Sequence, residues 1–243
     1  MDMEEKIEHA KELIATAIKR WPKIAIACSF GKDSIVVSHI AKQVDPNIKI
    51  FSVMTRFKPK ETYEYLKMMN KKMNLNTTVY IVADSVPKDL EDDDLNFVLL
   101  PAEEFEKKQK ELKETTGKEI YIADPDDCCR MLKVEPTKVA VKDIDAWICG
   151  LRCNEGPVRK DYCEIQEKGG LFKVNPILEF TEAEIWRYLS TRGITPNPLY
   201  AKGYRSLGCA PCSKPGGKYE RDGRWIGTSK CGGECGIHTK RLK

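Results

Sequence analysis

Cysteines are the residues of this sequence best suited to chemistry, and the 243-residue chain has ten of them. Cys128 and Cys129 are adjacent, and Cys209 and Cys212 follow as a Cys-x-x-Cys pair roughly eighty residues later. Four thiolates could hold zinc or an iron–sulfur cluster. Adjacent side chains diverge strongly, which favours a cubane because it offers a separate iron to each sulfur. A redox-active Cys-x-x-Cys pair and buried inert thiols are the alternatives.

A second chemical feature is the segment Ser29-Phe30-Gly31-Lys32-Asp33-Ser34. It lies between a predicted strand at Lys23–Cys28 and a predicted helix at Ser34–Gln43, where backbone N–H groups and the helix dipole favour an anion. The segment lacks the Gly-x4-Gly-Lys-Ser/Thr spacing of Walker loops and is not one of them. An ordinary Gly-Ser turn is the simpler alternative.

Strands and helices alternate around this loop, which predicts an α/β, Rossmann-like fold with a central, mostly parallel sheet. Further strands are expected at Ile48–Val53, Thr77–Ala83 and Ala146–Cys149, and further helices at Met1–Arg20, Lys60–Met73, Pro136–Val141 and Thr181–Leu189. In the last helix, Thr181 and Glu184 form a capping-box pattern before apolar residues. Residues 84–118 are highly charged and are interpreted as a surface excursion containing a Lys/Glu-rich helix. No internal repeat is found.

Positive charge is concentrated at the C-terminal end of the sequence. The segment from Lys202 to Lys243 holds ten Lys/Arg against three Asp/Glu, a net charge of +7 in a chain whose total is +4. Nine of the sixteen glycines also lie there. This tail is therefore expected to be irregular and backbone-rich, which suits a small polyanion. A solvated basic tail is the alternative.

The N-terminal segment bears on the cellular compartment. Met1–Arg20 is highly charged and has apolar residues at helical spacing, so it is neither a signal peptide nor a membrane span. A soluble, cytoplasmic protein is expected. Because the cytosol keeps thiols reduced, metal ligation or thiol chemistry is a better interpretation of the cysteines than a disulfide framework.

Several motifs together resemble one known family. The loop at 29–34 is similar to the Ser-Gly-Gly-x-Asp-Ser loop of the PP-loop adenine nucleotide family, which includes ATP pyrophosphatases, the small subunit of sulfate adenylyltransferase and the sulfonucleotide reductases. The two cysteine pairs occur in the order and approximate spacing of cluster-containing adenylyl-sulfate reductases. The remaining matching motifs are Glu61-Thr62-Tyr63, Gly150-Leu151-Arg152, Arg221-Asp222-Gly223-Arg224-Trp225 and Glu234-Cys235-Gly236-Ile237-His238. The match runs over most of the chain.

The resemblance implies an adenine nucleotide α-hydrolase-like fold, a 4Fe-4S cluster, and thioredoxin or a similar dithiol protein as reductant. It divides the chain into a PP-loop reductase domain at 1–200 and a cluster-binding and catalytic tail at 201–243. Cys235 resembles the nucleophile of the family, and Lys133 resembles the lysine close to cluster and sulfate. The implied cluster ligands are Cys128, Cys129, Cys209 and Cys212. The implied cationic groups that hold sulfate and phosphate are Arg152, Arg221, Arg224 and His238.

These residue types suit the reduction of a phosphosulfate, here called PAPS with a 3′-phosphate and APS without one. A Cys235 thiolate would attack the sulfate sulfur, form an S-sulfocysteine and release PAP or AMP, while Lys, Arg and His groups neutralise the sulfate. A partner thiol would then attack Cys235 and expel sulfite. Because Cys235 must become accessible for this step, we expect a mobile tail that closes on substrate and opens to the partner.

Two departures from the reductase pattern bear on the nucleotide. Lys32 and Asp33-Ser34 are kept as in ATP-using relatives, and Met54-Thr55-Arg56 stands where reductases often have Asp-Thr-Gly. Arg56, together with Lys32, Lys58 and Lys60, supplies positive charge where a ribose phosphate would lie, which favours PAPS by a small margin. The cluster motif favours APS. The loop residues from Ser29 to Ser34 and Arg56 are accordingly expected to bind substrate.

Two other functions compete with reduction. The closer is a PP-loop ATP pyrophosphatase that adenylates a substrate, in sulfur transfer to RNA or as a sulfate adenylyltransferase-like enzyme. A zinc module whose basic tail contacts nucleic acid ranks third, and no membrane partner is expected. Cys231 could be a resolving thiol, a further metal ligand or incidental, and His238 could be a surface histidine. A homo-oligomer is left open.

Overall fold

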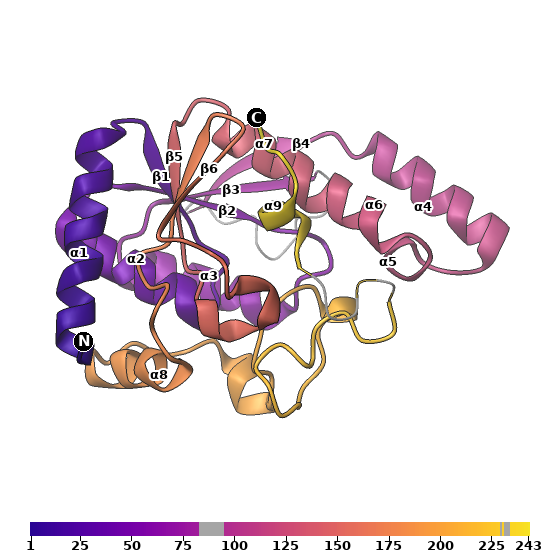
Figure 1. The fold of residues 1–243 in the computed structure, drawn as a ribbon. Helices are drawn as coiled ribbons and strands as arrows, with labels where there is room; N and C mark the ends of the chain where they lie inside the picture. The colour runs from indigo at the N-terminus through magenta and orange to yellow at the C-terminus, as the bar shows by residue number, and fades with distance from the viewer. Residues whose placement is uncertain (83–94, 229, 231–233) are drawn as a thin grey trace.

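A seven-stranded sheet forms the centre of the computed structural model, which describes residues 1–82, 95–228, 230 and 234–243. The strand order is β4-β3-β2-β1-β5-β7-β6 (Figure 1). Neighbouring strands are parallel, except that β6 pairs antiparallel with β7. The strands are β1 Ile24–Ala27, β2 Lys49–Val53, β3 Thr77–Val82, β4 Asn96–Leu100, β5 Ala146–Cys149, β6 Ile165–Lys168 and β7 Leu171–Val174. The predicted α/β class and mostly parallel sheet are confirmed.

Helices pack on both faces of the sheet. Ile24 and Ile26 of β1 join one apolar cluster with side chains of α1, α2, α3 and α8, whereas Ala25 joins a second cluster with Val141 of α7. This division follows from the alternation of side chains along a strand. The helices are α1 Met3–Arg20, α2 Lys32–Val44, α3 Lys60–Lys72, α4 Glu103–Thr116, α5 Ile120–Ala123, α6 Pro125–Cys129, α7 Glu135–Val141, α8 Glu182–Thr191 and α9 Gly236–Thr239.

The predicted helix boundaries agree with the observed ones to within a few residues. At the start of α8, the Thr181 hydroxyl accepts the backbone N–H of Glu184, and the Glu184 carboxylate accepts the N–H of Thr181, so the predicted capping box is confirmed. A second capping box, between Asp2 and Glu5, begins α1. None of the helices among the described residues combines the length and the apolar character that a membrane crossing requires.

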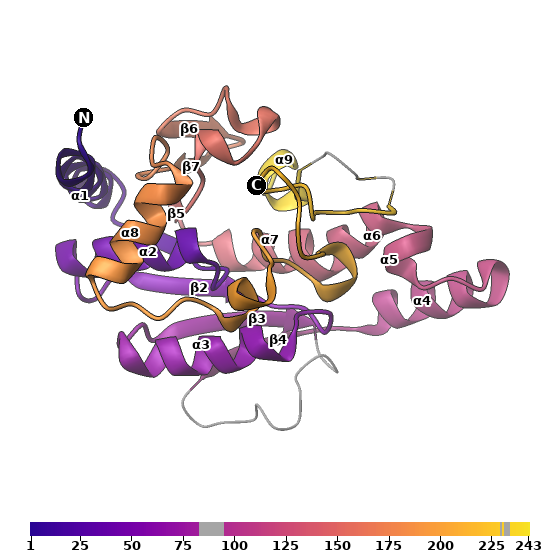
Figure 2. The same cartoon turned by 90° about the horizontal axis from the view of Figure 1, so that it is seen from below.

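The interpretation of residues 84–118 as a surface excursion is wrong in part, because Asn96–Leu100 forms β4 and pairs with β3 at the edge of the sheet. The charged residues before this short strand hid its pattern. The following helix α4 does reach away from the sheet (Figure 2), and Phe105 is its one buried residue. The β6–β7 hairpin was also missed, because β6 is a polar edge strand whose residues are mostly exposed.

The fold creates a crevice next to β1. β1 leads to β2 on one side, whereas β5 pairs on its other side, and open parallel sheets bind ligands where the strand order changes direction in this way. A continuous helical run from Pro125 to Val141 passes nearby and contains a π-helical turn at Arg130–Val134. Such turns often occur at functional sites. Helix α9 lies against this π-helical turn, so the end of the chain returns to the crevice.

Candidate active site

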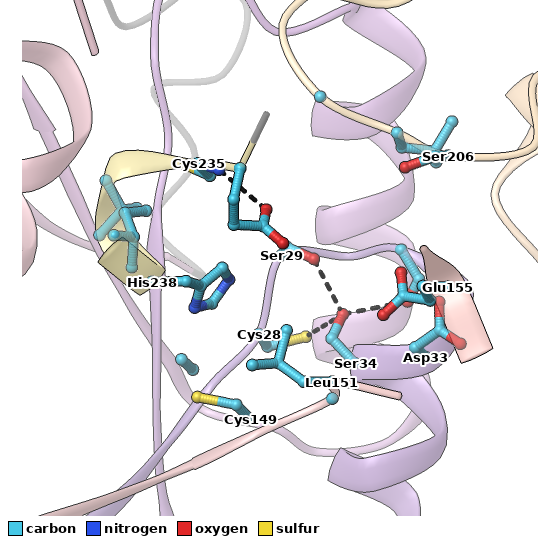
Figure 3. A pocket seen from close by; sticks show the side chains of 18 of the residues that line it. Cys28, Ser29, Asp33, Ser34, Cys149, Leu151, Glu155, Ser206, Cys235 and His238 are labelled. Carbon is cyan, nitrogen blue, oxygen red and sulfur yellow. Dashed lines mark hydrogen bonds between the residues drawn. The ribbon is translucent and has the colours of Figure 1, made fainter. Parts of the chain in front are cut away.

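A cavity of about 190 Å³ lies at the carboxyl ends of β1 and β5. Figure 3 shows Cys235 and His238 on one side of this cavity, with Ser29 of the loop after β1 and Ser34 of the first turn of α2 facing them. The residues expected from the sequence that line the cavity are Ser29, Gly31, Lys32, Asp33, Ser34, Lys133, Arg221, Arg224, Cys235 and His238. The fold thus brings the loop, the helical run at 125–141 and the C-terminal tail to one place.

Three residues that were expected to bind substrate do not line the cavity. Phe30 is fully buried in the core with a φ of 59°. Arg56 lies instead against α4, where its guanidinium is 2.6 Å from Glu106 and 5.1 Å from the ring centre of Phe105. Arg152 is completely buried behind the loop. The prediction that Arg56 adds positive charge at the substrate is therefore not supported.

Glu234 fixes the backbone next to Cys235. Its Oε1 accepts the Cys235 N–H at 2.8 Å and a hydrogen bond from Arg221 at 2.8 Å, and its Oε2 accepts a hydrogen bond from Arg159 Nε at 2.6 Å. Burial opposes the charged form of this carboxylate, but the hydrogen bond and charge of Arg159 outweigh burial and hold the pKa of Glu234 well below its usual value. A carboxylate between two guanidinium groups therefore positions the start of α9, where the Cys235 thiol is half-buried.

Two arginines from the tail lie over the ring of a buried tryptophan at the cavity wall. The guanidinium carbons of Arg224 and Arg221 lie 4.5 and 5.2 Å from the ring centre of Trp225. Arg224 also donates to the carbonyl of Leu207 at 2.5 Å, while its Nε has no partner among the described residues. A side chain at Gly208 would collide with this guanidinium at 2.4 Å, so the backbone is built to admit it. Arg224 is thus fixed by its contacts and keeps an N–H group that could donate a hydrogen bond to a bound anion.

His238 lies in the cavity, but its charge state differs from the sequence-based expectation. Its ring stacks on Trp147 with a centroid distance of 6.1 Å, and its Nδ1 is buried without a partner among the described residues. Burial, supported by the charge of Lys173, lowers the pKa of His238 well below its usual value. His238 is thus a neutral imidazole at neutral pH and not one of the cations.

Lys32 and Asp33 of the loop belong to a buried ion-pair network. Lys32 Nζ forms a salt bridge with Glu220 and lies 3.1 Å from Asp33 Oδ2. Arg152 donates from Nε to Asp33 at 2.6 Å and from its NH2 group to Glu220 at 2.5 and 2.6 Å. Burial alone would raise the pKa of Asp33, but the charges of Lys32 and Arg152 hold it below its usual value. Burial, with the charge of Asp33, raises the pKa of Glu220 above its usual value, although Lys32 and Arg152 oppose this shift. The salt bridges of Glu220 to these two cations favour its carboxylate form, in which the four groups neutralise one another.

The four expected cluster ligands converge on one small space. Cys128, Cys129, Cys209 and Cys212 are all buried, and together with Lys133 they line a cavity next to the active-site cavity. Lys133 lies in the π-helical turn and lines both spaces. The hydroxyl of Thr55 lies 3.2 Å from Cys209 Sγ. The helical run and the Cys-x-x-Cys turn thus bring two distant sequence pairs together, as the sequence predicted.

The spacing of these thiols bears on which group they could hold. Within the described ranges, the one place where three potential ligand atoms lie within 4.8 Å of one another is Asp33, Glu155 and Glu220, so no three of the four sulfurs are that close. A tetrahedral zinc ion with Zn–S bonds of about 2.3 Å would bring its sulfurs to about 3.8 Å from one another. A cubane binds each sulfur at a separate corner. The donor set therefore fits an iron–sulfur cluster better than one zinc ion.

Sequence reasoning missed several residues of the site. Glu234 was quoted only as part of a motif, and its neighbour in space, Arg159, was not considered. Tyr200, Glu155 and Cys28 also line the cavity and were not expected there. Lys58, which was expected near a ribose phosphate, lines it as well, and so does Cys149. The positions of Glu234 and Glu220 directly before Cys235 and Arg221 could have marked them as candidate site residues. No sequence pattern pointed to Arg159. Cys231 lies outside the described residues.

The sequence is similar to a known protein family and to named proteins from other organisms. Residues 23–215 match a family model described as the phosphoadenosine phosphosulfate reductase domain. A protein from Lysinibacillus sphaericus named adenosine 5′-phosphosulfate reductase is 32% identical over 235 residues, which cover 92% of this chain and 90% of the relative. A Bacillus pumilus protein of the same name is 34% identical over 220 residues, covering 89% of this chain and 84% of the relative.

Solved structures share the fold at low sequence identity. The phosphoadenylyl-sulfate reductase of Candida auris, solved as a phosphate complex, superposes with a TM-score of 0.61 at 19% identity, covering 83% of this chain and 88% of the other. The FMN adenylyltransferase of Candida glabrata superposes with a TM-score of 0.59 at 14% identity, covering 88% of this chain and 67% of the other. The fold is thus one that serves both sulfonucleotide reductases and adenylyl-transferring enzymes.

Proposed function

The chain belongs to the phosphoadenosine phosphosulfate reductase domain family, and we propose that it reduces APS to sulfite through a covalent intermediate on Cys235. It is an oxidoreductase that acts on a sulfonucleotide in sulfate assimilation. The observation that carries the proposal is the placement of Cys235 in one cavity with the phosphate loop, Lys133 and Arg224. A nucleophile and fixed cations around one cavity are what attack on a phosphosulfate requires.

In the first step, the Cys235 thiolate attacks the sulfur atom of APS. A sulfur–sulfur bond forms, the bond between sulfur and the phosphate oxygen breaks, and AMP leaves with the bonding electrons. The product is an S-sulfocysteine. Three cations line the cavity around Cys235, namely Lys133, Arg221 and Arg224, and they neutralise the sulfonate and phosphate charges. Because these groups are already in place, they stabilise the charge of the transition state and lower the barrier. His238, which is neutral, can exchange a hydrogen bond with the substrate or the thiol.

In the second step, a thiolate of thioredoxin or a similar dithiol protein attacks Sγ of Cys235. The sulfur–sulfur bond of the intermediate breaks, sulfite leaves with both electrons, and the second thiol of the partner resolves the mixed disulfide. Because Cys235 is half-buried, the tail at 201–243 must open around it before this exchange. We place both proteins in the cytoplasm, where the dithiol is kept reduced.

APS is proposed as the nucleotide in preference to PAPS. The relatives that are 30 to 34% identical are named adenosine 5′-phosphosulfate reductases. The argument from the sequence for a 3′-phosphate was the combined charge of Arg56, Lys58 and Lys60 with Lys32. Arg56 pairs with Glu106 and does not line the cavity. Lys32, the second expected phosphate ligand, is neutralised by Glu220 and Asp33. Of the cations expected for a 3′-phosphate, Lys58 does line the cavity, so the structural argument against PAPS rests on Arg56 and Lys32.

A 4Fe-4S cluster on Cys128, Cys129, Cys209 and Cys212 is proposed as the cofactor. The cluster would supply a fixed charge distribution beside the sulfonate and would tie the Cys-x-x-Cys turn of the tail to the helical run. Since the dithiol provides both electrons, no redox step is assigned to it. Lys133, which lines both the cysteine space and the active-site cavity, is the residue of this chain that would link the two.

Metal analysis tests the cofactor. Protein purified without oxygen is expected to contain about four iron atoms and about four labile sulfides per chain, because four thiolates suffice for one cubane. Cys209→Ser should lose most of this iron and its visible absorbance. Cys163→Ser is the matched control, since Cys163 is exposed and does not line the cluster cavity. Stoichiometric zinc without iron in the parent protein would contradict the cluster.

Substrate turnover tests the function. Incubation with APS and reduced thioredoxin should release sulfite and AMP in equal amounts, and the rate with PAPS should be at least about tenfold lower, a difference of about 1.4 kcal/mol in the barrier. Incubation with ATP should yield no pyrophosphate. Pyrophosphate release from ATP with no sulfite from either sulfonucleotide would instead identify a PP-loop ATP pyrophosphatase.

A further inference from the structure

The phosphate loop carries a conspicuous cation that the reduction of APS does not use. Lys32 lies at the start of α2, and its side chain is only 1% exposed. Two carboxylates surround its ammonium group, Asp33 from the loop itself and Glu220 from the tail. The carbonyl of Arg205 lies 3.4 Å from the same nitrogen and adds a third acceptor. The three N–H groups of the Lys32 ammonium can therefore all be satisfied by acceptors of the protein itself.

The backbone of the loop is engaged as well. The first N–H of α2, that of Lys32, donates to the hydroxyl of Tyr200 at 2.8 Å. A Cβ atom added to Gly150 would lie 2.8 Å from the backbone nitrogen of Ser34, so the chain after β5 packs directly on the next turn of the loop. In a free loop of this kind, these N–H groups and the lysine would bind a phosphate chain.

Glu220 holds the cations of this network in place of an external anion. Its carboxylate accepts both Lys32 and the NH2 group of Arg152, and its side chain is 5% exposed. A carboxylate from the tail thus lies between two cations, Lys32 and Arg152, and is their shared anionic partner. Arg152 NH1 is buried with no partner among the described residues, so the network still holds one unused donor.

We propose that Glu220 and Tyr200 form a built-in plug that closes the phosphate loop to pyrophosphate groups and so restricts this site to nucleotides without one. A pyrophosphate at the loop would have to displace the Tyr200 hydroxyl and would bring its charges against the Glu220 carboxylate. APS carries a single phosphate next to its sulfonate, and Lys133, Arg221 and Arg224 line the cavity as cations that are not part of the plug. The plug excludes ATP by negative charge and not by size.

This inference deepens the proposed function, since it assigns the nucleotide selectivity of the same cavity, and it rests on that function for the identity of the true substrate. The test, however, measures binding of inorganic pyrophosphate and needs no turnover. Sulfite release from APS is assayed separately on the parent protein. A failure of the plug would leave sulfite release unchanged, whereas a failure of the reductase assignment would appear in that assay alone.

Glu220→Gln is the decisive variant, because it removes the charge and keeps the shape. Calorimetric titration with inorganic pyrophosphate should give a dissociation constant at least about tenfold lower for Glu220→Gln than for the parent chain, since Lys32 and Arg152 regain the capacity for charge-assisted bonds to an anion. Pyrophosphate should also raise the thermal midpoint of Glu220→Gln by several degrees and leave that of the parent nearly unchanged. A merely structural role of Glu220 would not create affinity for pyrophosphate.

Glu182→Gln is the matched control. Glu182 is another carboxylate beside the tail, but it accepts Arg205 at 2.5 Å and has no contact with Lys32, so its variant should bind pyrophosphate like the parent. Tyr200→Phe removes the hydroxyl that accepts the Lys32 N–H and should strengthen pyrophosphate binding about threefold. This variant tests the plug if Glu220→Gln does not fold. Equal pyrophosphate affinity in the parent and in every folded variant would overturn the plug.

Discussion

Replacing Cys235 by serine is expected to lower the rate of sulfite release from APS by at least about 10⁴-fold. A serine hydroxyl at neutral pH is a far weaker nucleophile than a thiolate, and an oxygen adduct would not allow the second thiol exchange that expels sulfite. The variant should fold normally, because Cys235 is half-buried and the anchor of this segment is the carboxylate of Glu234. The loss should therefore appear in turnover and not in stability.

Intact-mass spectrometry after incubation with APS, in the absence of any dithiol, separates the two steps. The parent protein should gain one SO₃ group, and peptide mapping should place it on Cys235. Cys149→Ser is the most demanding control, because Cys149 is a second thiol in the same cavity. Burial raises the pKa of Cys149 to about 12, so it is a poor thiolate donor, and its variant should still form the adduct. An adduct on Cys149, or sulfite release by Cys235→Ser, would refute the catalytic assignment.

The elements that carry the site were predictable because their signals are local. The apolar run at Ile24–Ala27 followed by a Gly-Lys loop and an apolar helix indicated a strand–loop–helix unit, and β1 and α2 confirm it. The run at Ala146–Cys149 predicted β5, which is buried along its whole length. Because parallel strands bring their carboxyl ends to one edge, Ser29 and Gly150 lie at the same edge of the sheet, and the pairing of β1 with β5 places their strands side by side.

What the sequence could not supply was the identity of long-range partners. Arg56 follows a strand as a binding residue would, but α4 places Glu106 and Phe105 beside it. Glu220 lies in a turn-rich segment 188 residues from Lys32, and no local pattern links the two. His238 has the sequence context of a catalytic group, yet its neutral state is set by burial against Trp147. Partner choice depends on packing that periodicity does not encode.

The charged groups around the cavity form one connected network that ends at the nucleophile. Arg152 links the loop to Glu155 through its backbone N–H at 3.2 Å, and Arg159 joins Glu155 to Glu234. The network contains equal numbers of positive and negative side chains, namely Lys32, Arg152, Arg159 and Arg221 with Asp33, Glu155, Glu220 and Glu234. Because buried charges are stable only when paired, the network stabilises the closed arrangement of the loop and the tail.

Glu234→Gln is the variant that tests whether this network positions Cys235. The amide keeps the size of the side chain, but its NH₂ group would face a guanidinium donor, and Arg159 and Arg221 would lose their common counterion. We expect the rate of adduct formation at saturating APS to fall about 10²-fold, since a displacement of about 1 Å at a nucleophile can have that effect. The free energy of unfolding should fall by about 3 kcal/mol, as for other buried pairs that lose one partner.

Two measurements distinguish positioning from mere loss of folded protein. The final amount of adduct per chain should equal that of the parent, because every folded molecule still reacts, while the rate constant of its formation is lowered. Removing a negative charge beside a thiolate favours the thiolate, so electrostatics alone would accelerate attack, and a slower reaction reports geometry. Glu164→Gln, which alters an exposed ion pair with His9 far from Cys235, should match the parent in rate, amount and stability. An unchanged rate constant in Glu234→Gln would show that Cys235 is positioned by α9 alone.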